Sequence, residues 1–156
     1  SLVTAATTHL DGYTGILGRA LVTQTWRQDF DGFCSRLRLP LVAATITEVR
    51  AFAEDDNTGS AVTSTNYELL EDALGSYARF IDDYAFPTSV RETRGVRVTF
   101  TAGYGAAASV PQAIKQAAFL LIGHWFANRE ASVGTTFEEL PLGVKALLTP
   151  YRRIGV

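Results

Sequence analysis

The segment from Val96 to Glu130 limits the possible folds of this chain more than any other. Apolar and polar residues alternate from Val96 to Thr101, which is the period of a strand with one buried face. Gly103 and Gly105 follow at once and favour a sharp turn, because glycine adopts backbone angles that other residues avoid. The sequence therefore predicts a half-buried strand that ends in a glycine turn.

A long helix is expected after this turn. Ser109 and Gln112 match the S-x-x-Q capping box, and Pro111 fits the first helical turn, where a missing N–H costs nothing. The apolar residues that follow predict a helix over Pro111 to Ala131. One short stretch thus combines a strand and a helix in the same fold.

The rest of the chain places a β-rich middle between helices. Apolar residues recur at helical spacing from Leu2 to Leu17, and Gly18 stands where a helix-ending glycine is common. A second C-terminal helix is expected over Leu142 to Thr149. The strand candidates are rich in β-branched residues or alternate in polarity, and they are 20–30, 35–39, 45–53, 62–69, 77–81 and 96–101. These expectations give an α+β class, with a β-rich central layer flanked by an N-terminal helix and two C-terminal helices.

Composition favours a single domain and disfavours a nucleic-acid grip. The chain has 156 residues, of which 47% are hydrophobic, so it can build one core, which we expect over residues 1–149. The formal charge is -2 and no run of four or more basic residues occurs, so an electrostatic footprint for duplex DNA is missing. We predict that Arg36, Arg38, Arg91, Arg94 and Arg97 form no DNA site, because Glu48, Glu54, Asp82 and Asp83 can offset them.

No arrangement of residues points to catalysis or to a bound metal. His9 and His124 are the only histidines and lie far apart in sequence, and Cys34 is the only cysteine. The acidic run Glu54 to Gly59 fails the calcium-loop pattern because its glycine comes one place early. The glycines also fit no dinucleotide or phosphate loop. We predict no catalytic residue, no cofactor and no metal site.

The predicted helix after Pro111 is apolar nearly all round. Ile114, Leu121 and Trp125 define one apolar face, while Phe119 and Phe126 occupy much of the remainder. A domain of this size rarely encloses a helix completely. Either the β layer and the neighbouring helices cover both sides, or a second copy of the chain does, and the sequence leaves both open.

The last seven residues, 150–156, are expected to leave the domain as a docking tail. Pro150 ends the preceding helix, and the residues after it combine an aromatic, two guanidinium groups and an aliphatic anchor, a composition typical of interfaces. The alternative is a frayed polar tail. The predicted partner-binding residues are Pro150, Tyr151, Arg152, Arg153 and Ile154.

Several sequence blocks together resemble one protein family. They are Thr14 to Leu21 leading into Gln24-Thr25-Trp26, Leu39-Pro40 followed by the strand from Thr45 to Phe52, Tyr67 to Leu69, the FTAGYG turn with Val110-Pro111, and Leu147 to Arg152. With these blocks the chain resembles the head-tail connector, or adaptor, proteins of long-tailed bacteriophages and phage-derived gene transfer agents.

This resemblance implies a structural role in a particle. Such a protein forms a ring, typically dodecameric, beneath the portal and gives the tail a docking surface. The implied partners are further copies of the chain, the portal protein, and a stopper or tail-completion protein, while packaged DNA passes through the lumen without specific binding. The implied location is the neck of a virion or phage-like particle, assembled in the bacterial cytoplasm. Two alternatives stay open, another neck component such as a stopper or tail-completion protein, and a small-molecule-binding α+β domain.

Overall fold

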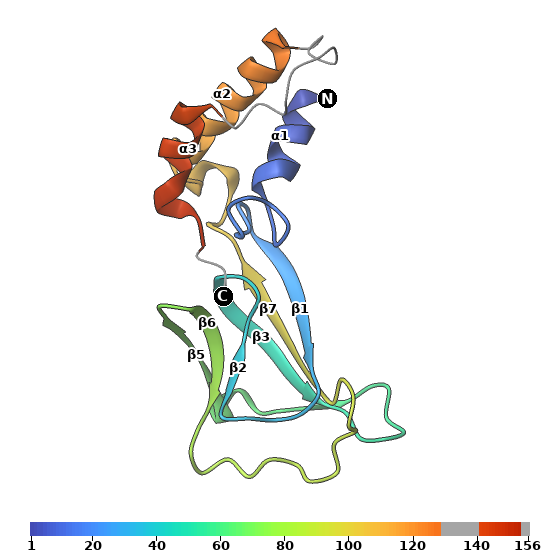
Figure 1. The fold of residues 1–156 in the computed structure, drawn as a ribbon. Coiled ribbons are helices and arrows are strands. Elements are labelled where there is room, and N and C mark those ends of the chain that lie inside the picture. The colour runs from blue at the N-terminus through green and yellow to red at the C-terminus, as the bar shows by residue number, and fades with distance from the viewer. Residues whose placement is uncertain (129–140, 154–156) are drawn as a thin grey trace.

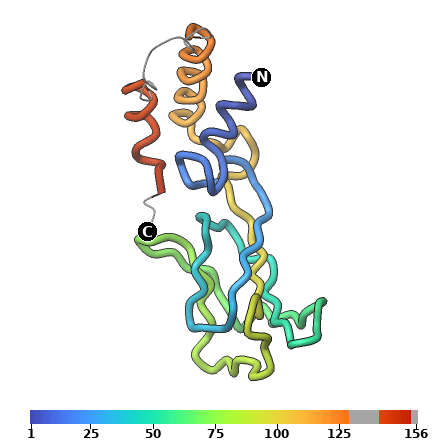
Figure 2. The backbone as a smooth tube through the Cα atoms, turned by 45° about the vertical axis from the view of Figure 1, so that its right-hand side comes forward, coloured from blue at the N-terminus to red at the C-terminus, as the bar shows by residue number. Residues whose placement is uncertain are grey.

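The computed structural model describes residues 1–128 and 141–153. Figure 1 shows helices gathered at one end of an elongated molecule and strands at the other, and Figure 2 shows the same division from a second direction. The α+β class predicted from the sequence is confirmed. The helices are α1 Leu2–Leu10, α2 Gln112–Ala127 and α3 Leu142–Leu148, with short 3-10 turns η1 Ser64–Asn66, η2 Ala107–Ser109 and η3 Thr149–Tyr151. The strands are β1 Gln24–Phe30, β2 Arg36–Arg38, β3 Ala43–Ala51, β4 Ser60–Ala61, β5 Tyr67–Asp72, β6 Gly75–Phe80 and β7 Val96–Ala102.

Two antiparallel sheets form the strand end. One has the order β1-β7-β3-β4 and the other the order β2-β6-β5. Val96, Val98, Phe100 and Ala102 of β7 all have 0% exposure, as the strict alternation predicts. They belong to a cluster that also takes Leu37 and other residues from both sheets. The core of the strand end therefore lies between the two sheets.

The helical end has a second apolar cluster. Ile114 and Ala117 of α2 meet Leu10 at the end of α1 and Val144 of α3, and all four are buried. Leu17, from the loop after α1, is buried in the same cluster. No helix among the described residues is long and apolar enough to span a membrane.

The N-terminal helix is shorter than its apolar spacing predicts. It ends at Leu10, and Asp11 after it has extended backbone angles. The Asp11 carboxylate accepts hydrogen bonds of 2.7 Å from the Leu21 backbone N–H and from Gln24 Nε2, which closes the following residues into a loop. Leu17 matched the helical period because it is a core residue, although it reaches the core from this loop.

Two other local predictions are wrong. The expected strand over 62–69 is broken by the 3-10 turn η1, where the Asn66 N–H donates to the Thr63 carbonyl, and β5 begins only at Tyr67. The capping box is not formed, because Ser109 lies in η2 and the cap of α2 is Pro111, with no side-chain hydrogen bond. The glycine turn is present. Gly103 has a φ of 118°, and a Cβ there would lie 2.2 Å from the Val22 carbonyl oxygen.

Candidate functional site

Residues 150–153 fold back on the chain and do not leave it. Pro150 lies inside η3, which continues the path of α3, and Tyr151 packs half-buried against the apolar cluster of the helical end. The Arg153 backbone N–H donates to the Leu17 carbonyl at 2.9 Å. The expected release of the chain at Pro150 is therefore wrong for residues 150–153. Ile154, the last predicted docking residue, lies outside the described residues.

The Arg153 side chain explains why this segment stays attached. Its guanidinium donates to the carbonyl oxygens of Pro40, Leu39 and Leu74, the last two at 3.4 Å. Gly75 leaves room for this approach, since a Cβ there would lie 3.1 Å from Arg153 Nη2. Arg153 thus joins the helical end to both sheets. Pro150 and Arg152 stay exposed, so of the predicted docking residues these two face solvent in the free chain.

An apolar face on α2 is directed away from the core. Phe119 is 65% exposed and Leu120 is 42% exposed, while Ile114 and Leu121 on the opposite side are buried. Leu142 at the start of α3 is 82% exposed as well. We call the exposed apolar residues Phe119, Leu120 and Leu142 the outer face. In the described residues, therefore, neighbouring elements bury one side of α2 and leave the outer face accessible.

Sequence reasoning found this helix but could not say which side was open. Trp125, which the sequence places on the same apolar face as Ile114 and Leu121, lies half-buried, with its ring edge-to-face to His9 at a centroid distance of 5.8 Å. Leu142 was missed as a surface residue. Its position at the first residue of a short helix, where few neighbours can cover it, is the signal that points to exposure.

Several arginines of the strand end are paired with acids. Of the five that were predicted to be offset, Arg38 pairs with Asp72, and Arg94 and Arg97 pair with Asp29, which are not the acids named for them. Arg38 forms two hydrogen bonds to Asp72, at 2.8 and 2.6 Å, and Arg97 donates to Asp29 at 2.8 Å. The hydrogen bonds from Arg38 lower the pKa of Asp72 to about 2. The pKa of Asp29 is also lowered, because the Arg97 hydrogen bond and nearby positive charges outweigh the effect of burial, which raises it.

Nothing in the described residues brings catalytic groups together. No group of three or more His, Cys, Asp or Glu side chains there could hold a metal ion. His9 contacts Trp125, whereas Asn128 donates to the His124 backbone carbonyl at 2.8 Å. A surface hollow of about 700 Å³ is lined mainly by α1 and Trp125, and His9 is the titratable side chain among the residues that line it. The predicted lack of a catalytic residue stays a prediction.

Comparison with known proteins gives matches among solved structures. No protein-family profile matches the chain. No curated protein matches it at a significant level. The chain is similar to a chain of the neck of a native GTA particle computed with C12 symmetry, with 23% identity, a TM-score of 0.74, and coverage of 99% of this chain and 81% of that one.

Two further structures agree. One is the neck of an empty GTA particle computed with C6 symmetry, with 24% identity, a TM-score of 0.75, and coverage of 99% of this chain and 76% of that one. The other is the virion of a native gene transfer agent particle, with 23% identity, a TM-score of 0.72, and coverage of 99% and 76%. The resemblance read from the sequence blocks is thus confirmed at the level of the fold, and this chain folds like a protein of the gene transfer agent neck.

Proposed function

We propose that this chain is a structural protein of the neck of a phage or gene transfer agent particle, where it forms a ring adaptor between the capsid portal and the tail. The observation that carries this proposal is the fold match to a gene transfer agent neck over 99% of the chain. Because the match covers almost the whole chain, it favours a role in assembly that this chain shares with the neck protein.

The outer face supports self-assembly. Single exposed apolar side chains are normal on a protein surface, but adjacent exposed ones such as Phe119 and Leu120, with Leu142 exposed at the start of α3, are typical of a contact surface. A closed ring repeats one contact between two different surfaces of neighbouring copies. The outer face can supply one of these two surfaces. The necks to which this chain is similar were computed with C12 and C6 symmetry, which favours a dodecameric ring.

The charge distribution suits a channel through which DNA slides. Arg38, Arg79 and Arg97 each have a carboxylate partner within the chain, which leaves fewer cations for phosphates. We expect no duplex binding by the purified chain at about 200 mM salt, where a few phosphate contacts are already weakened severely. Binding of duplex DNA by the purified chain at this salt concentration would contradict a lumen through which DNA passes without being bound.

The exposed residues Pro150 and Arg152 are proposed to contact the portal protein. Tyr151 and Arg153 are held by the chain itself, so their role is to present these two neighbours in a fixed place. The opposite surface of the ring would receive the stopper or tail-completion protein. Assembly is proposed to take place in the bacterial cytoplasm, before the particle leaves the cell.

The experiment that tests the proposal removes the chain from producing cells. We expect DNA-filled heads without tails, counted by electron microscopy, and recovery of tailed particles when the wild-type chain is supplied. Tailed particles in normal yield without the chain would contradict an adaptor role. Mixing the purified chain with purified portal separates the adaptor from a stopper: an adaptor binds the portal directly, and a stopper binds only a portal that already carries its adaptor.

A further inference from the structure

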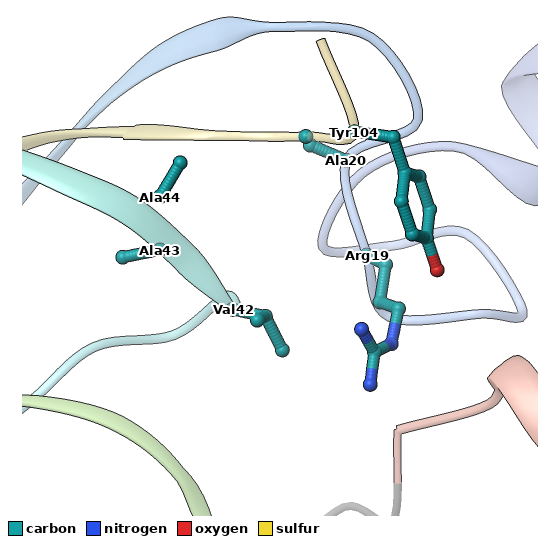
Figure 3. A pocket seen from close by; sticks show the side chains of 7 residues that line it. Arg19, Ala20, Val42, Ala43, Ala44 and Tyr104 are labelled. Atoms are coloured by element: carbon teal, nitrogen blue, oxygen red, sulfur yellow. The ribbon is translucent and has the colours of Figure 1, made fainter. Parts of the chain in front are cut away.

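Arg19 lies where the helical end meets the strand end. We call this place the junction, and it consists of the loop from Asp11 to Leu21, the start of β3 and the Gly103-Tyr104 turn. The loop is fixed by the two hydrogen bonds that Asp11 accepts and by the Gly12 N–H, which donates to the Arg19 carbonyl at 2.8 Å. The backbone of Arg19 is therefore anchored, and its side chain leaves the loop in a defined direction (Figure 3).

The guanidinium of Arg19 has no partner among the residues that the structure describes. It makes no hydrogen bond, ion pair or ring contact with any described residue, and its Nε atom is buried without an acceptor. Arg38 and Arg97 bind carboxylates, and the Nη atoms of Arg153 donate to carbonyl oxygens although its Nε also lacks an acceptor, whereas no atom of the Arg19 guanidinium bonds to a described residue. A buried charged donor with no acceptor costs more than an ordinary missing hydrogen bond. Arg19 is thus placed to gain a partner from outside.

A hollow of about 100 Å³ lies beside this guanidinium. Its other walls are small or aliphatic residues such as Ala20, Val42 and Ala43, and it includes no acidic side chain. Figure 3 shows the Tyr104 ring next to Arg19, with the hydroxyl and the guanidinium directed the same way. The hollow has room for only a few non-hydrogen atoms and offers two kinds of donor, which suits a carboxylate. A guanidinium binds a carboxylate through two parallel hydrogen bonds.

We propose that Arg19, with Tyr104 beside it, is a docking site for a carboxylate on another protein chain of the neck, an aspartate or glutamate side chain. This inference rests on the proposed function, because it needs a protein neighbour at the junction. An acidic side chain would complete the hydrogen bonds of Arg19 and exclude water from the hollow. The contact therefore favours a specific partner and a fixed register, as buried charge pairs at interfaces do.

The test compares Arg19→Leu with Arg27→Leu, a matched loss of an exposed arginine on β1. In the purified chain, Arg19→Leu should leave the melting temperature unchanged or raise it, since it removes a half-buried cation whose Nε has no acceptor. In producing cells it should lower the yield of tailed particles at least about tenfold, because losing one partner of a buried charge pair weakens an interface severely. Arg27→Leu should change neither quantity. Tyr104→Phe should lower the yield less than Arg19→Leu.

A selection then identifies the chemistry of the partner. Starting from Arg19→Glu, we expect second-site suppressors in which an aspartate or glutamate of a neck protein becomes lysine or arginine. Four results would each overturn the inference. Two concern Arg19→Leu itself, namely a normal yield of tailed particles or a lowered melting temperature. The third is a set of suppressors that never change an acidic residue, and the fourth is heads that no longer fill with DNA, which would mean that Arg19 contacts DNA phosphates. If tails form without any copy of the chain, the proposed function itself fails.

Discussion

The strand end and the helical end of this molecule use their apolar residues in different ways. In the strand end, Val98 and Phe100 are sealed between two sheets and the nearby arginines are mostly paired with acids. In the helical end, α2 buries Ile114 and Leu121 on one side, while Phe119 and Leu120 on the other stay exposed. The first region completes its own core, and the second retains apolar surface that association can bury.

From this difference we expect the strand end to determine the stability of the single chain and the outer face to determine its association. Burial of apolar surface contributes about 25 cal/mol per Å² wherever water is excluded, whether by the same chain or by another. Substitutions in the strand end should therefore change the free energy of unfolding of the single chain. Substitutions on the outer face should change association and leave unfolding nearly unaltered.

Phe100→Ala should give the largest loss of stability. Phe100 of β7 is fully buried. It lies opposite Trp26 of β1 on one side and Ile46 of β3 on the other. Truncating such a side chain leaves a cavity and should lower the free energy of unfolding by roughly 3–5 kcal/mol. Urea denaturation of the purified chain measures this. A loss near 0.5 kcal/mol, the size expected on a surface, would mean that the strand end does not hold the core described above.

Arg153→Met should have the next largest effect. It keeps most of the aliphatic stem but leaves the carbonyls of Pro40, Leu39 and Leu74 without their charged donor. Hydrogen bonds to charged groups contribute about 1.5–3 kcal/mol, so a loss of that size is expected. The control is Arg152→Met at the exposed neighbour, which should melt like wild type. Equal melting temperatures for both variants would show that Arg153 does not join the two ends.

Arg38→Gln should give a smaller loss that depends on pH. The pKa of Asp72 is about 2 in the folded chain, below its ordinary value of 3.8. A carboxylate with a lowered pKa stabilises the fold above its ordinary value, and this contribution disappears as pH falls to the lowered one. The melting temperature of the variant should therefore lie below wild type at neutral pH and approach it between pH 3.8 and about 2. A difference that stays constant over this range would contradict the ion pair.

Phe119→Asp should have the smallest effect on folding, within about 0.5 kcal/mol, because the side chain is exposed. Its effect on assembly should be large, since a charge at an apolar contact must be desolvated. Sedimentation and portal binding measure assembly, and thermal melting measures folding. Thr8→Asp, on the exposed surface of α1, is the control. A variant that still assembles as wild type does would remove the outer face from the ring contact.

Local patterns in the sequence predicted those elements that local physics decides. The alternation in β7 and the apolar run in α2 follow directly from which side chains must avoid water. The end of α1 could not be predicted, because Asp11 is held by Leu21 and Gln24, which lie 10 and 13 residues away. The loop brings Leu17 into the core in a way that imitates a helical period.

The candidate site shows the same limit more strongly. Composition identified Tyr151 and Arg153 as anchors, but not whether their partner would be another protein or the chain itself. Arg153 reaches Pro40, which is 113 residues away in sequence, and no local pattern carries that information. Arg19 lies within a sequence block that carried the family resemblance, yet its missing partner is visible only when its surroundings are known.

The attachment of Arg153 also has a mechanical consequence. This one residue is tied by hydrogen bonds to the loop after α1, to the segment before β3 and to the turn between β5 and β6. A force applied at the end of the chain must break these bonds before it reaches α3, so the load is shared among three distant segments. If the end of the chain is bound to another ring, tension between the rings spreads through the whole subunit, and α3 is protected from being peeled away.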